Sequence, residues 1–134
     1  KVLKLVSVYL ACLIIFLAVD MIWLRVVAKD LYATEMGSLI RADVNLRAAI
    51  AFYLLYAAGL TYFAIMPSLD GRAVLQALTL GGGLGLVAYG TYDLTNLAVV
   101  NGFGPKIALI DLVWGTAVSA VSAAVVVAFL GRAV

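Results

Sequence analysis

Three aspartates lie inside otherwise apolar stretches of this chain, where charged side chains are rare. They are Asp20, Asp93 and Asp111. An ionised side chain in the middle of a bilayer costs about 3 kcal/mol or more, so such residues usually face the interior of a helix bundle and mark function. Buried carboxyl groups can bind a cation, hold a proton or exchange protons with a substrate. The chain therefore contains a candidate ligand or proton site in its apolar part.

Aromatic and amide side chains accompany these aspartates at helical spacing. Trp23 and Trp114 each follow an aspartate by three residues, which places each pair on one helix face. The alternative is that the aromatics are ordinary residues of the membrane interface and that the polar groups form a purely structural hydrogen-bond network. Three aspartates expected at nearly the same depth nevertheless favour a site. The residues predicted to bind a ligand or a proton are Asp20, Asp93, Asp111, Asn96, Tyr53, Tyr56, Tyr89, Tyr92, Trp23 and Trp114.

Metal, cofactor and nucleic-acid functions find no support in the sequence. The chain has no histidine, and Cys12 is its single cysteine, so the commonest metal ligands are missing. The glycine run at 81–85 is not followed by the Gly-Lys-Ser/Thr pattern of a phosphate-binding loop. A net charge of +2 without a basic tract argues against nucleic acid. We therefore predict no metal, no cofactor and no nucleic-acid partner.

The composition assigns the chain to the integral membrane proteins. Two thirds of its 134 residues are hydrophobic and only 12% are charged. A soluble domain of this length could not bury so much apolar surface. The lipid bilayer is therefore the expected environment of the chain.

Four apolar stretches are long enough to cross a bilayer as helices, at approximately 5–27, 47–66, 73–100 and 107–130. We interpret the first as a retained span rather than a cleaved signal, because its apolar run is too long. Short links at 67–72 and 101–105 predict an antiparallel four-helix transmembrane bundle, with residues 1–134 as a single four-span domain. Residues 29–46 predict a short amphipathic helix at the interface, with an irregular loop as the alternative, and Asp43 is a candidate cap for the second span. This topology places the three aspartates on one side of the bundle.

Basic residues do not decide the orientation of the bundle. Four lie on the side of the termini and five on the other, so the positive-inside rule has little to act on. A homodimer of oppositely inserted copies stays open, as does assembly into a larger membrane complex.

Three segments resemble a known family. They are Phe52-Tyr53-Leu54-Leu55-Tyr56, Tyr89-Gly90-Thr91-Tyr92-Asp93-Leu94-Thr95-Asn96-Leu97-Ala98 and Asp111-Leu112-Val113-Trp114-Gly115. They are similar to a bacterial family of small predicted membrane proteins known as domain of unknown function 2177. The resemblance covers nearly the whole chain and implies a four-span protein of the bacterial inner (cytoplasmic) membrane. It implies no activity, so the catalytic role of any residue stays unknown.

Three functions fit these residues. The first is binding or transport of a small amphipathic, lipid-like or cationic compound by an acidic and aromatic pocket, with proton coupling through the carboxyl groups. The second is a membrane enzyme that performs acid–base chemistry on a lipid or isoprenoid. The third is an accessory subunit of a larger complex, in which the aspartates are structural. We favour the first.

Overall fold

Four long helices make up most of the structure, which is a computed structural model describing residues 1–132. The helices that are long and apolar enough to cross a membrane are Val2–Val27, Leu46–Leu69, Val74–Val99 and Pro105–Leu130. Helices satisfy their backbone hydrogen bonds internally, as the interior of a bilayer requires. The predicted all-α, four-span architecture is thereby confirmed.

Two of the four spans contain a turn of π-helix. The first span consists of α1 (Val2–Ile22) and the π-helical turn η1 (Trp23–Val27), and the second of α3 (Leu46–Leu60), the π-helical turn η3 (Thr61–Ile65) and α4 (Met66–Leu69). The third and fourth spans are α5 (Val74–Val99) and α6 (Pro105–Leu130). Such turns often occur at functional sites. Here, η1 begins at Trp23, one of the predicted site residues.

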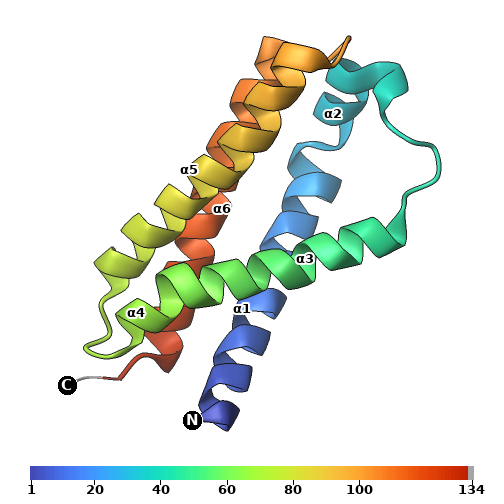
Figure 1. Cartoon of the computed structure of the whole chain (residues 1–134). Helices are drawn as coiled ribbons and strands as arrows, with labels where there is room; N and C mark the ends of the chain where they lie inside the picture. The colour runs from blue at the N-terminus through green and yellow to red at the C-terminus, as the bar shows by residue number, and fades with distance from the viewer. Residues whose placement is uncertain (133–134) are drawn as a thin grey trace.

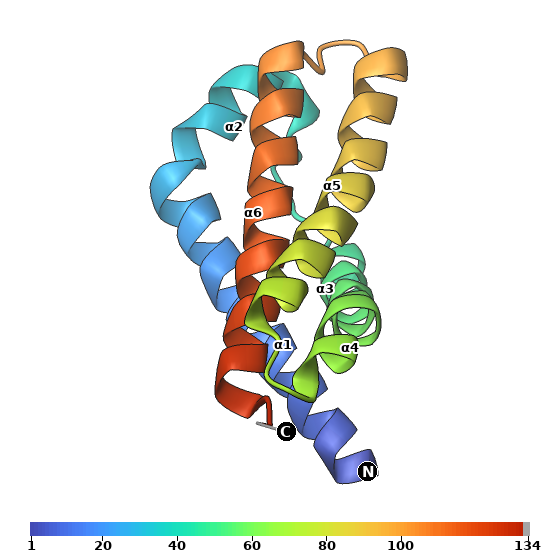
Figure 2. The ribbon, with the colours of Figure 1, turned by 90° about the vertical axis from the view of Figure 1, so that its left-hand side faces the viewer.

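Helices α5 and α6 form the closest pair, because small residues face one another along their contact. A Cβ atom on Gly85 would lie 2.5 Å from the carbonyl oxygen of Gly115, and one on Gly81 would lie 2.7 Å from that of Ser119. The space beside Gly115 is filled by the ring of Tyr89. The two helices run in opposite directions and lie side by side in both views (Figures 1 and 2).

Helix α3 departs from a regular bundle. It crosses α1 obliquely, and its N-terminal end lies apart from the other helices (Figure 1). Its aromatic residues pack on α1, where the ring of Phe16 lies 5.1 Å from that of Tyr56 and 6.0 Å from that of Tyr53. Farther along, Gly59 has a single neighbour near its Cβ position, a Leu84 methyl group at 3.9 Å. Bulky rings therefore separate α3 from α1 at one end, whereas the small Gly59 faces Leu84 of α5 at the other.

The predicted amphipathic helix is shorter than expected and packs on the bundle. It comprises α2 (Lys29–Met36) and a 3₁₀ turn, η2 (Gly37–Leu39). Leu31, Tyr32 and Met36 pack against the apolar cluster of Phe103, Ile107 and Ala108 at the start of α6. Asp43 does not cap the second span, because α3 begins at Leu46 and its N-cap position is residue 45. Asn45 takes that role, and its side chain accepts a hydrogen bond from the Ala48 amide at 3.2 Å.

The close approach of α5 and α6 predicts opposite effects for two neighbouring glycines. Gly85→Ala should lower stability by about 1–3 kcal/mol, because the new methyl group collides with backbone. Gly83→Ala is the matched control, since nothing lies within 4 Å of its Cβ position. It should be neutral or stabilising by up to about 1 kcal/mol, because alanine favours helix. Thermal unfolding in detergent, followed by circular dichroism, checks both variants. Equal melting temperatures of Gly85→Ala and Gly83→Ala would contradict the close packing of α5 against α6 at Gly85.

Candidate functional site

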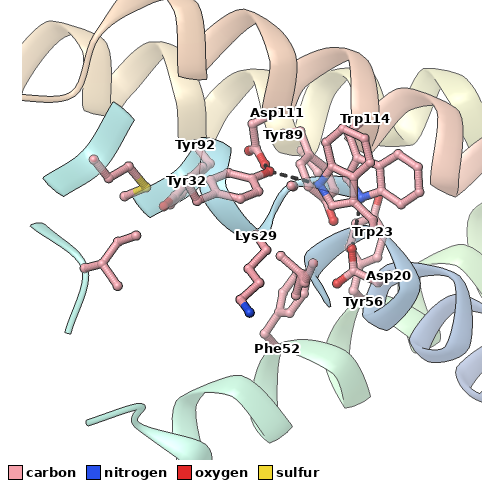
Figure 3. A pocket seen from close by; sticks show the side chains of 15 residues that line it. Asp20, Trp23, Lys29, Tyr32, Phe52, Tyr56, Tyr89, Tyr92, Asp111 and Trp114 are labelled. Atoms are coloured by element: carbon pink, nitrogen blue, oxygen red, sulfur yellow. Dashed lines mark hydrogen bonds between the residues drawn. The ribbon is translucent and has the colours of Figure 1, made fainter. Parts of the chain in front are cut away.

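A cavity of about 790 Å³ opens between the first span, α2, α3, α5 and α6. Figure 3 shows its side chains, which are mostly aromatic or aliphatic, with two carboxylates and one ammonium group among them. Its lining consists of Asp20, Trp23, Leu24, Ala28, Lys29, Tyr32, Met36, Ile40, Phe52, Tyr56, Ala88, Tyr89, Tyr92, Asp111 and Trp114. A largely apolar cavity with a few convergent polar groups is typical of small-molecule sites.

Asp20 is held at the cavity wall by two neutral donors. Its side chain is almost completely buried, with 6% of the residue exposed. The indole nitrogen of Trp114 donates to one carboxyl oxygen at 2.9 Å, and the hydroxyl of Tyr53 donates to the other at 2.5 Å. The ion pairs of the described residues are Lys4–Asp70 and Lys106–Glu35, so no lysine or arginine neutralises Asp20 there.

Asp111 has a similar environment, built with the help of α2. The hydroxyl of Tyr32 donates to it at 2.7 Å and accepts a hydrogen bond from the indole nitrogen of Trp23 at 3.2 Å. Burial is the main reason why the pKa of Tyr32 lies above its ordinary value. The phenol therefore keeps its proton at neutral pH and remains a donor to Asp111.

The two indole rings join these carboxylates into one network. The rings of Trp23 and Trp114 are stacked, with centroids 4.4 Å apart and planes 6° from parallel. Each aspartate precedes its own tryptophan by one turn, about 4.5 Å of helix rise. Since α1 and α6 run in opposite directions, the carboxylates lie on opposite sides of the stack along the bundle axis. The sequence placed them at nearly one depth, whereas the structure separates them by the indole pair.

Asp93 differs from both, because it is buried behind the cavity. None of its surface is exposed, and neither carboxyl oxygen has a hydrogen-bond partner among the described residues. It does not line the cavity, but its carboxyl group is close enough to that of Asp111 for the two to interact. An unpartnered polar group in a protein interior calls for an explanation.

The remaining predicted residues divide into two groups. Tyr56, Tyr89 and Tyr92 line the cavity together with both tryptophans, Asp20 and Asp111. Tyr53 contacts the site through Asp20, whereas Asn96 does not line it. The sequence thus indicated seven lining residues and one supporting residue.

Sequence reasoning missed the contribution of α2 and of Phe52. Tyr32, Lys29 and Met36 line the cavity, and the ammonium group of Lys29 points away from both carboxylates in Figure 3. The helical spacing of Tyr32 and Met36 was visible, but it was interpreted as a face lying on the membrane. Their position depends on the packing of α2 against α6. Within residues 1–132, no group of three or more His, Cys, Asp or Glu residues is arranged to hold a metal ion.

Comparison with known proteins assigns the family. Residues 5–128 match the profile of the family described as predicted membrane protein, DUF2177. The chain belongs to this family. It is a membrane protein of a family with no known activity. The match includes the second and third spans completely and omits only the first residues of the first span and the last residues of the fourth. The comparisons found no match among functionally curated proteins and none among solved structures.

The bonds to Asp20 predict a spectroscopic and energetic change in Asp20→Asn. An amide offers one acceptor oxygen instead of two, and that oxygen is uncharged, so the hydrogen bond from Trp114 is either lost or weakened. Stability should fall by about 1–3 kcal/mol. The indole N–H resonance of Trp114 should move upfield in ¹⁵N–¹H NMR spectra, and that of Trp23 should move less. The exposed Asp43→Asn should change neither resonance. An unmoved Trp114 resonance in Asp20→Asn would contradict this hydrogen bond.

Proposed function

We propose that this protein binds a small amphipathic compound with a cationic group in the cavity beside Asp20 and Asp111. The observation that carries this proposal is the pairing of the two carboxylates with neutral donors alone, in an aromatic cavity. Hydrogen bonds from hydroxyl and indole groups orient a carboxylate but leave its charge uncompensated. A ligand cation would supply the missing charge.

The energetics favour such a ligand. Opposite charges about 4 Å apart attract by about 4 kcal/mol at an effective dielectric constant of about 20. The rings of Tyr56, Tyr89 and Tyr92 add aromatic faces, each of which can contribute about 0.5–2 kcal/mol to cation binding. The aliphatic side chains of Leu24, Met36 and Ile40 suit the apolar part of the ligand. Charge and hydrophobic surface thus lie in one cavity, as an amphipathic cation requires.

The open position of α3 offers a route from the bilayer. Residues 46–55 of α3 are mostly exposed, including Ile50, Leu54 and Leu55. The cavity is lined by one residue on each side of the connection between α2 and α3. These are Ile40, which follows η2, and Phe52 on α3. A ligand dissolved in the membrane would enter laterally between these segments.

A line of hydroxyl groups supports the further step from binding to transport. Tyr56, which lines the cavity, shares a hydrogen bond of 2.6 Å with Ser119 on α6. Ser122 lies one turn farther along α6, and Thr61 lies beyond Tyr56 on the second span. Both hydroxyls are buried without a partner among the described residues. These polar groups continue from the cavity toward the end of the bundle that holds the termini, which suits passage of a proton or a polar ligand.

Binding predicts quenching of the tryptophan fluorescence by a cationic amphiphile. The chain has two tryptophans, and both line the cavity, so the signal reports on this site. In phosphatidylcholine nanodiscs, decyltrimethylammonium should quench saturably, and neutral decanol should bind at least about tenfold more weakly. Asp20→Asn should weaken binding by about tenfold or more, equivalent to about 1.4 kcal/mol. Asp43→Asn, an exposed site, is the matched control.

Equal affinities for decyltrimethylammonium and decanol would refute the role of the carboxylates. So would an Asp20→Asn variant that binds the cation as the parent protein does. Mass spectrometry of the recovered probe tests the enzymatic alternative, because binding alone returns the probe unchanged. Counterflow in vesicles distinguishes transport from binding.

Removal of the positive charge at the cavity should strengthen cation binding. Lys29 lines the cavity without an ion-pair partner in the described part of the chain. Lys29→Gln should raise the affinity for decyltrimethylammonium by about two- to fivefold, because a repulsive charge is removed. The gain should shrink at high salt, where exposed charges are screened. Arg25→Gln, at an exposed residue that does not line the cavity, should have a smaller effect, and equal effects would argue against a local role of Lys29.

A further inference from the structure

The buried carboxyl group of Asp93 has no role in the cation site described above. It is completely buried, lacks hydrogen-bond partners among the described residues and does not line the cavity. An ionised carboxylate without a partner in a protein interior is very unfavourable, and such a group becomes neutral by taking up a proton. A protonated carboxyl group carries no net charge, so this position can tolerate it.

No neighbouring positive charge in the described part of the chain could neutralise an ionised Asp93 in place of a proton. From α6 the facing titratable group is Asp111, and from α5 itself it is Tyr92. From α2, Tyr32 contacts Asp111 rather than Asp93. Neither aspartate forms an ion pair with a lysine or arginine in the part of the chain that the structure describes. Two carboxyl groups so close together cannot easily both be ionised, and their protons are then a property of the pair.

We propose that Asp93 and Asp111 hold one proton between them and release it when a cation binds beside Asp111. Before binding, the pair has one carboxylic acid and one carboxylate. On binding, the O–H bond of the acid breaks, the proton leaves to water and both groups become carboxylates. The site loses one positive charge and gains another, so the exchange is electrically neutral. The proton release depends on the function proposed above, whereas the shared proton does not.

The geometry assigns different tasks to the two groups. Asp111 lines the cavity and can contact a ligand, whereas Asp93 does not line it and interacts with Asp111. A cation at Asp111 therefore makes the second negative charge tolerable without touching Asp93. In the opposite direction, protonation of the pair weakens cation binding. Cation affinity should consequently rise with pH, by at most about tenfold per pH unit for exchange of one proton.

Infrared spectroscopy tests the shared proton without any ligand. The parent protein in nanodiscs at pH 7 should show the carbonyl stretch of a protonated carboxylic acid, which should move when the aspartates carry ¹³C at the carboxyl carbon. Asp93→Asn should remove this band. Asp111→Asn should keep it at a shifted frequency, because the protonated Asp93 loses the carboxylate with which it shares the proton, and Asp43→Asn should leave it unchanged. Absence of the band in the parent protein would overturn the proposal, as would its persistence in Asp93→Asn or an unchanged band in Asp111→Asn.

Calorimetry tests the release of the proton. Titration of decyltrimethylammonium in buffers of different ionisation enthalpy should show release of up to one proton per ligand bound. Asp93→Asn should lose this release and the pH dependence of affinity. Binding without proton release by the parent protein would overturn the exchange. If the probe does not bind at all while the infrared band is present, the proposed ligand is wrong and the shared proton stands.

Discussion

The stacked indoles of Trp23 and Trp114 are the contact on which the candidate site depends. They join the two helices that carry Asp20 and Asp111 and donate, directly or through Tyr32, to both carboxylates. The bonds are crossed, because the tryptophan after each aspartate serves the other aspartate. Neither helix could therefore satisfy its own carboxylate alone. The two helices can therefore dock correctly only when both carboxylates receive their hydrogen bonds, which makes the position of the site specific.

A gradient of side-chain size explains why the cavity described above lies in the half of the bundle away from the termini. Glycines and serines bring α5 and α6 together, and Gly115 leaves the space that Tyr89 occupies. Beside the indole pair, large rings on α1 and α3 hold the helices apart. Since the cavity arises from this separation, its aromatic walls and its volume have the same cause. Substitutions that shrink the rings would alter helix spacing as well as ligand contacts.

The fold could be predicted from hydropathy almost completely, whereas the site could be predicted only in part. Span boundaries follow from lengths of apolar sequence, which respond to the bilayer rather than to tertiary contacts. The same information does not say that α2 folds onto α6, so Tyr32 and Lys29 were missed. It also does not reveal the oblique path of α3 that opens the cavity. The repeated Asp-x-x-Trp pattern was visible, but two fixed positions cannot distinguish chance from the crossed pairing that the structure shows.

Burial separates three aspartates that the sequence presents as equivalent. Asp20 has a donor for each oxygen, Asp111 has one donor and faces the cavity, and Asp93 has none. A group with two donors is oriented and has little freedom to change partner. A group without donors stays a neutral acid in the interior until a nearby cation makes its ionised form tolerable. Asp111 lies between these extremes and contacts both the cavity and Asp93, so it is the one position where a ligand charge and a proton can affect each other. This difference in hydrogen bonding, rather than the number of carboxylates, is what allows a binding site and a proton site to be coupled in so small a bundle.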